Sequence, residues 1–120
     1  MGLFKRAELR LSARVPNLEL QERVSNILND LGFKKHGMIG DSQLLFIERV
    51  GLLKNALEVS ADFGHVGQDG FARMQFGLNI FYAIGFKVLS LPDRRRHGRL
   101  IEAFIARIRS DPDIRIIDQK

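Results

Sequence analysis

The densest group of chemically active side chains in this 120-residue sequence is a run of cations. In chain order they are Arg94, Arg95, Arg96, His97 and Arg99. The run follows Pro92 and Asp93, which are typical of a helix start, where partial positive charge disfavours further cations. Guanidinium groups and the N–H groups of a first helical turn bind phosphate or carboxylate well. We therefore interpret the run as an anion-binding site; the alternative is that Asp93 caps the helix and the arginines extend into water.

A second group of candidate residues lies on two predicted strands. Arg10 and Arg14 alternate along the first strand, and Phe71 and Arg73 along a longer one. Arginine interleaved with aromatic rings suits phosphate contacts and base stacking, so these four residues form a candidate nucleic-acid face. Residues 69–76 resemble the RNA-recognition strand of RRM domains, but Arg73 stands where that family places the ring that stacks on a base.

Enzymatic and metal chemistry find little support in the sequence. The chain has no cysteine, which excludes disulfides, Cys-ligated zinc and thiol nucleophiles. His36, His65 and His97 lack a second histidine at metal-ligand spacing. No phosphate loop, nucleophile elbow or dinucleotide fingerprint occurs. We expect neither a metal nor a cofactor, and an enzyme is disfavoured but left open.

The charge of the chain is unevenly distributed. Lys and Arg number 19 against 14 Asp and Glu, a formal net charge of +5 at pH 7. The surplus falls in residues 1–14 and 86–120, whereas residues 15–85 are slightly acidic. Since chain ends often lie close together, the two portions can form one basic surface; the alternative is an ordinary solvated face of mixed charge. Such a surface favours an acidic protein surface or nucleic acid as partner.

Apolar periodicity indicates the elements that position these residues. Strict alternation predicts a strand over 7–15, followed by a helix that Asn17 caps and Gly32 closes. Further strands are predicted over 33–37, 43–50, 54–63, 71–83 and 86–91, with the glycine-rich residues 64–70 as a hairpin loop. A second helix runs from Pro92 to Asp111, and a last strand covers 113–118.

This order of elements, β-α-β-β-β-β-β-α-β, predicts a single α+β domain over residues 1–120. We expect an antiparallel-dominated sheet of about five to seven strands with both helices packed on one face. The crossover of the first helix also allows mixed or split pairing near the centre of the sheet. Strand order does not follow from the pattern. The most apolar stretch, residues 76–86, is too short to span a membrane, and no export signal is present. A cytoplasmic location is therefore expected.

The leading functional interpretation is a small non-enzymatic binding or assembly module. Its basic surface near the start of the second helix would contact an anionic partner, and its long strands or apolar patches would support a homodimer. One alternative is a nucleic-acid-binding protein that uses the same surface. A second is a small-molecule-binding domain or enzyme, because the order of elements resembles helix-grip ligand-binding domains in outline. In such a fold the cavity would be lined by Phe76, Ile80, Tyr82, Phe104 and Ile108.

Overall fold

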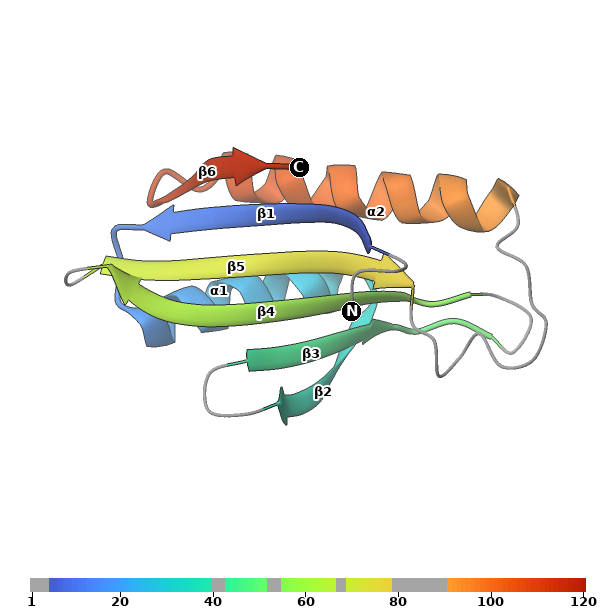
Figure 1. Cartoon of the computed structure of the whole chain (residues 1–120), viewed down its shortest axis with the longest axis horizontal. Helices are drawn as coiled ribbons and strands as arrows, with labels where there is room; N and C mark the ends of the chain where they lie inside the picture. Colours follow the sequence, from blue (N-terminus) through green and yellow to red (C-terminus); the bar gives the residue numbers. More distant parts are fainter. Residues whose placement is uncertain (1–4, 40–42, 52–54, 67–68, 79–90) are drawn as a thin grey trace.

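The computed structural model describes residues 5–39, 43–51, 55–66, 69–78 and 91–120 (Figure 1). Its elements are β1 (Lys5–Ala13), α1 (Asn17–Asp30), β2 (Phe33–Ile39), β3 (Gln43–Glu48), β4 (Leu57–Val66), β5 (Asp69–Leu78), α2 (Leu91–Arg109) and β6 (Ile114–Gln119). The predicted α+β class is confirmed. The strand expected over 86–91 lies outside the described residues except for Leu91, which begins α2.

The strands form one six-stranded sheet in the order β2-β3-β4-β5-β1-β6. All neighbouring strands in it are antiparallel, as the predicted class of sheet requires, and the mixed pairing that the crossover allowed does not occur among the described strands. The two strands joined by the crossover, β1 and β2, run in the same direction but are not neighbours in the sheet. α1 carries the chain from β1 to the far edge of the sheet, and β3, β4 and β5 then separate β1 from β2 (Figure 1).

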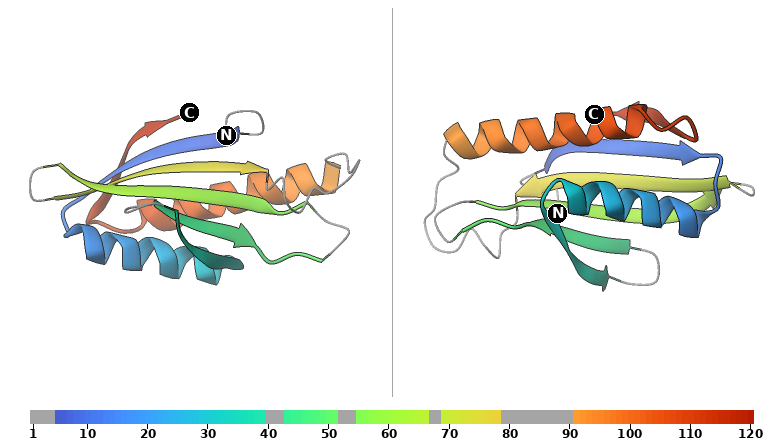
Figure 2. Two further views of the ribbon diagram at one scale, coloured as in Figure 1. Left: turned by 60° about the horizontal axis from the view of Figure 1, so that its bottom comes forward. Right: turned by 180° about the vertical axis from the view of Figure 1, so that it is seen from behind.

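Both helices pack on one face of the sheet, as predicted, and the opposite face carries no helix among the described elements (Figure 2). The shared core combines inward residues of the strands with the inner sides of both helices; examples are Leu9, Leu11, Met74, Phe76, Leu20, Val24, Leu28, Phe104 and Ile108. Phe76 and Phe104 meet edge to face, with ring centroids 5.5 Å apart. Neither helix of the described residues is long and apolar enough to cross a membrane.

The β4–β5 hairpin is longer than the sequence predicts. Pairing continues to Val66 and Asp69, so Gly64 and Gly70 lie within strands rather than in a loop. Gly70 has a steric role there, because a Cβ atom would sit 3.0 Å from the carbonyl oxygen of Val15. Its N–H donates to that same oxygen at 3.0 Å. The glycine therefore allows β5 to approach the β1–α1 turn.

The ends of α1 agree with the prediction at one end only. Gly32 follows the helix with a φ of +97°, the left-handed conformation expected of a glycine that closes a helix. Asn17, however, is the first helical residue rather than the cap. Pro16 holds the cap position with an extended backbone, and no side chain caps this end.

Candidate functional site

The cationic run at the start of α2 divides into an exposed and a buried part. Arg94, Arg95 and Arg99 are exposed, whereas Arg96 is half-buried and His97 is only 1% exposed. The division follows helical periodicity, because Asp93 and His97 lie one turn apart on the side that faces the sheet. The structure therefore places three of the five predicted anion-binding residues on the surface and turns Arg96 and His97 toward the protein.

Arg96 lies at the centre of an ion-pair network with two carboxylates. Its Nε donates to Oε2 of Glu48 at 2.6 Å, and its Nη1 donates to Oδ1 of Asp93 at 2.7 Å. Its Nη2 donates to the backbone oxygen of Asn55 at 2.7 Å. Burial lowers the pKa of Arg96, but the hydrogen bonds to Glu48 and Asp93 outweigh it, and the pKa is raised. Arg96 thus remains charged and is already supplied with anions from the chain itself.

His97 completes this network from the next position of the helix. Its Nε2 lies 2.7 Å from the backbone oxygen of Asn55 and, because a carbonyl only accepts, this nitrogen carries the donated proton. Nδ2 of Asn55 donates to Oδ2 of Asp93 at 3.0 Å, and Oε1 of Glu48 accepts the N–H of Leu57 at 3.0 Å. The network therefore joins the first turns of α2 to the end of β3 and the start of β4.

Burial shows that the network is internal. Glu48, Asn55, Asp93 and His97 are all less than a tenth exposed. The sequence interpretation missed Glu48 and Asn55, and no local pattern identifies them, because both lie far along the chain from Arg96. Asp93 is the one acidic member of the network close to Arg96 in the sequence, and from the sequence alone it was considered only as a helix cap. The arrangement orients α2 and presents Arg94, Arg95 and Arg99 outward.

The candidate nucleic-acid residues gather on the helix-free face of the sheet. Arg10 and Arg73 are directly opposite each other on β1 and β5, and Phe71, partly exposed, lies opposite Ser12. Arg14 is exposed just beyond the end of β1. The structure thus brings Arg10, Arg73 and Phe71 onto one surface.

That surface also carries carboxylates. Nε of Arg73 donates to Oε2 of Glu8 at 3.3 Å, and Nε of Arg10 lies 3.8 Å from the same oxygen and 4.0 Å from Oδ2 of Asp118. Asp62 is the register partner of Arg73 on β4. Acidic side chains therefore offset the positive charge of this face. The β1 and β6 strands lie side by side, so the two terminal strands of the chain are neighbours, and Asp118 of β6 lies beside Arg10 of β1 at their contact.

A second cluster of ion pairs connects α1 to the segment between α2 and β6. Nη1 of Arg23 donates to Oδ1 of Asp111 and to Oδ2 of Asp113, each at 3.0 Å, and Nη2 donates to Glu19. The hydrogen bond to Asp113 contributes most to raising the pKa of Arg23 above its ordinary value. Within the described part of the chain, no group of three or more histidine or acidic side chains is arranged to hold a metal ion.

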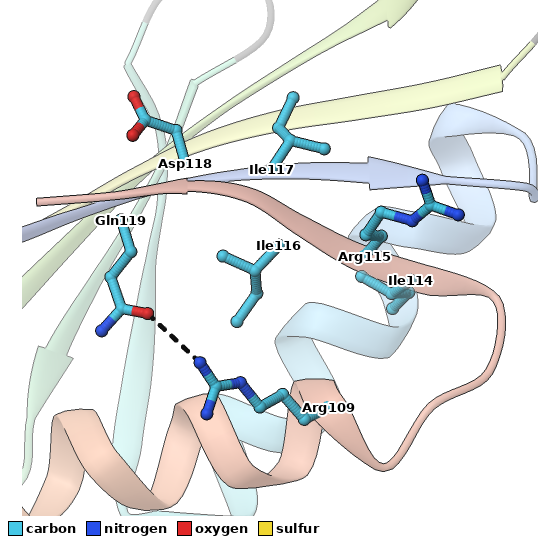
Figure 3. Close-up of a pocket in the computed structure, with 7 residues that line it drawn as sticks. All are labelled: Arg109, Ile114, Arg115, Ile116, Ile117, Asp118 and Gln119. Carbon is cyan, nitrogen blue, oxygen red and sulfur yellow. Dashed lines mark hydrogen bonds between the residues drawn. The ribbon is translucent and has the colours of Figure 1, made fainter.

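An open groove of about 520 Å³ lies beside β6 and the end of α2 (Figure 3). Six consecutive residues, 114–119, and Arg109 line it. Nη2 of Arg109 donates to Oε1 of Gln119 at 3.5 Å across the groove. Ile116 points toward α2, whereas Ile117 and Asp118 point to the other side of the strand (Figure 3).

Comparison with known proteins adds no functional assignment, because the chain matches no protein family and no curated protein.

Proposed function

We propose that this chain is a non-enzymatic binding module whose α2 helix docks an acidic protein surface. The proposal rests on the exposure of three arginines of α2 and on their lack of ion pairs within the described residues. Arg94, Arg95 and Arg99 are exposed, and none of them forms an ion pair with another described residue. In contrast, Arg96 beside them has two carboxylate partners. Three cations without ion-pair partners in the described part of the chain, all in the first half of one helix, favour an external anion.

The buried network supports binding because it holds the helix that carries these cations. Arg96 and His97 connect α2 to Glu48 and Asn55, so the backbone beneath the exposed arginines is fixed before a partner arrives. A fixed backbone reduces the conformational entropy lost on binding. In addition, Arg94 lies in the first turn of α2, where a cation opposes the helix dipole by about 0.3–1 kcal/mol, and a carboxylate of a partner would relieve that cost.

The charges around these arginines favour an acidic protein over nucleic acid. Glu102 is exposed one turn beyond Arg99 and interrupts the cationic side of α2. On the helix-free face of the sheet, the cations near Phe71 are offset by Glu8 and Asp118. A nucleic acid needs a continuous cationic path for its phosphates, whereas an acidic patch on a protein needs only a local one. Nucleic-acid binding by the same surface is the runner-up.

The test compares two labelled polyanions by fluorescence anisotropy at low salt: a poly-glutamate peptide and a single-stranded oligonucleotide. We expect the peptide to bind with an affinity that falls as salt rises. The triple variant Arg94→Ala, Arg95→Ala, Arg99→Ala should weaken this binding by about tenfold or more. Binding of the oligonucleotide alone would replace the proposal by its runner-up, and binding of neither polyanion would refute both.

A matched control separates the site from the general charge of the chain. The variant Lys34→Ala, Lys35→Ala, Arg49→Ala removes the same number of exposed cations from the edge strand β2 and from the residue that follows β3. We expect it to bind the peptide within about twofold of the unmodified chain, with the same salt dependence. Equal losses in both triple variants would show that net charge, and not α2, determines binding.

A further inference from the structure

The two edges of the sheet are protected to different degrees. At one edge, β2 exposes two consecutive lysines, Lys34 and Lys35, and such charges discourage pairing with another strand. At the other edge, β6 ends the sheet order among the described strands. Ile117 on β6 is 51% exposed, and an open groove runs along the strand. An exposed isoleucine on an edge strand is a site where a further strand can add.

The sequence of β6 is complementary to itself when two copies run antiparallel. Arg115 and Asp118 lie opposite Ser12 and Arg10 of β1, so both face the helix-free side of the sheet. The register shift between them leaves Ile117 as an extra residue of β6. Arg115 directly precedes the Ile116–Ile117 pair and Asp118 directly follows it, so a cation and an anion flank the two isoleucines symmetrically.

We propose that β6 pairs antiparallel with β6 of a second copy of this chain, about a two-fold axis near Ile116 and Ile117. This arrangement places Arg115 opposite Asp118 of the second copy, and by symmetry the same pair forms twice. Opposite charges directly across two strands stabilise their pairing. On the helix-free side, Ile117 of one copy is buried beside Ile117 of the other, while Ile116 of each copy stays directed toward α2. The groove beside β6 is then occupied by the other copy.

The dimer extends the sheet across both copies. Because the axis is perpendicular to the sheet, the helices of both copies lie on the same side, and the α2 surface proposed to bind acidic proteins is present twice. The inference does not rest on that binding, since no α2 arginine from the first turns contributes to the β6 edge. Failure of either proposal therefore leaves the other intact.

Sedimentation equilibrium of the full chain tests the oligomeric state. We expect a mass approaching twice the 13.7 kDa of the chain, and a return toward 13.7 kDa for Ile117→Lys, whose ammonium group would be buried at the axis. The control is Leu18→Lys, which changes the other large exposed apolar residue, 77% exposed at the start of α1, and should remain dimeric. A monomer at the highest soluble concentration, or a dimer unaffected by Ile117→Lys, would overturn the proposal.

Charge reversal tests the register directly. Arg115→Asp and Asp118→Arg should each weaken dimerisation by about tenfold or more, because like charges would then face each other twice. The double variant reverses both partners and should recover most of the lost affinity. Circular dichroism of each variant establishes that it is folded. A double variant no better than the two single variants would overturn the proposed pairing.

Cysteine cross-linking gives a measurement that does not depend on affinity. The chain contains no cysteine, so an introduced thiol has no competitor. Opposed residues of an antiparallel pair have Cα atoms about 4.5–5.5 Å apart, within reach of a disulfide. Under mild oxidation, a mixture of Arg115→Cys and Asp118→Cys chains should form a cross-linked dimer that neither variant forms alone. Absence of this product from the mixture would contradict the proposal.

Discussion

Arg96 and Arg94 lie two positions apart in the same helix, and the structure predicts losses of stability of very different size when each is replaced by alanine. The Arg96 side chain is 19% exposed and donates hydrogen bonds to Glu48 and Asp93, whose side chains are 6% and 5% exposed. Arg94 is exposed and has no ion-pair partner among the described residues. The two substitutions delete the same atoms from the same helix.

The expected magnitudes follow from what each arginine leaves behind. Arg96→Ala removes the guanidinium group from between two buried carboxylates, and breaking a buried pair in this way costs about 3–5 kcal/mol of unfolding free energy. It also removes the donor to the backbone oxygen of Asn55. Arg94→Ala affects only a solvated side chain, so the change should stay within about 0.5 kcal/mol.

Urea unfolding followed by circular dichroism measures both changes. For Arg96→Ala we expect a lower midpoint with an unchanged dependence on urea, since the loss lies in stability and not in the surface exposed on unfolding. The double variant Glu48→Gln, Arg96→Met should be more stable than Arg96→Ala, because it removes one of the two charges left unpaired.

Equal effects at the two positions would refute this reasoning. If Arg96→Ala costs less than about 1 kcal/mol, the network is not a buried ion pair, and the division of the run into internal and surface arginines fails. If Arg94→Ala is as costly as Arg96→Ala, then Arg94 has an internal role that the described contacts do not contain. Either result would also remove the basis for treating the exposed arginines as a docking surface.

The same unfolding assay tests three further positions. Gly98 lies inside α2 and is exposed, and a Cβ atom added there would meet no atom within 4 Å, so Gly98→Ala should stabilise the protein by about 0.5–1 kcal/mol; destabilisation would contradict the open space. Gly70→Ala should destabilise it by about 1–3 kcal/mol, because the new Cβ would lie 3.0 Å from a backbone oxygen, and a neutral result would refute the steric argument. Phe104→Ala removes the ring that packs against Phe76 and should cost about 3–5 kcal/mol; a loss under about 1 kcal/mol would mean that this part of the core is loosely packed.

Local patterns were sufficient to predict most elements but not their pairing. The alternation along β1 and the glycine that closes α1 predicted those elements within a few residues. Alternation also predicted β5, which begins two residues earlier than expected, while its predicted end at residue 83 lies outside the described residues. The sheet order was not predictable, because alternation states which residues face the core and not which strand lies beside which. The predicted hairpin loop was too long, because glycine occurs both in turns and where two backbone segments lie close together. Gly70 is of the latter type, since it lies within β5 against the backbone of Val15.

The candidate site shows the same division. Charge density along the chain identified the cationic run from Arg94 to Arg99. It could not separate Arg96 from its neighbours, because the acids that bind it are Asp93, three residues away, and Glu48, on a different element. Likewise, the sequence indicated Arg10 and Arg73 as cations of one face but not the buried Glu8 between them.

The sequence by itself determined the amphipathic strands and helices, the α+β class and the presence of a cationic segment in α2, because these depend on residues close together in the chain. Only the tertiary structure decided that β1 lies between β5 and β6, and that Arg96 and His97 turn inward while Arg94, Arg95 and Arg99 remain on the surface. Those outcomes depend on which distant segments the folded chain brings together. The reason is that ion pairs and hydrogen bonds form between groups a few ångströms apart in space, whatever their separation in sequence.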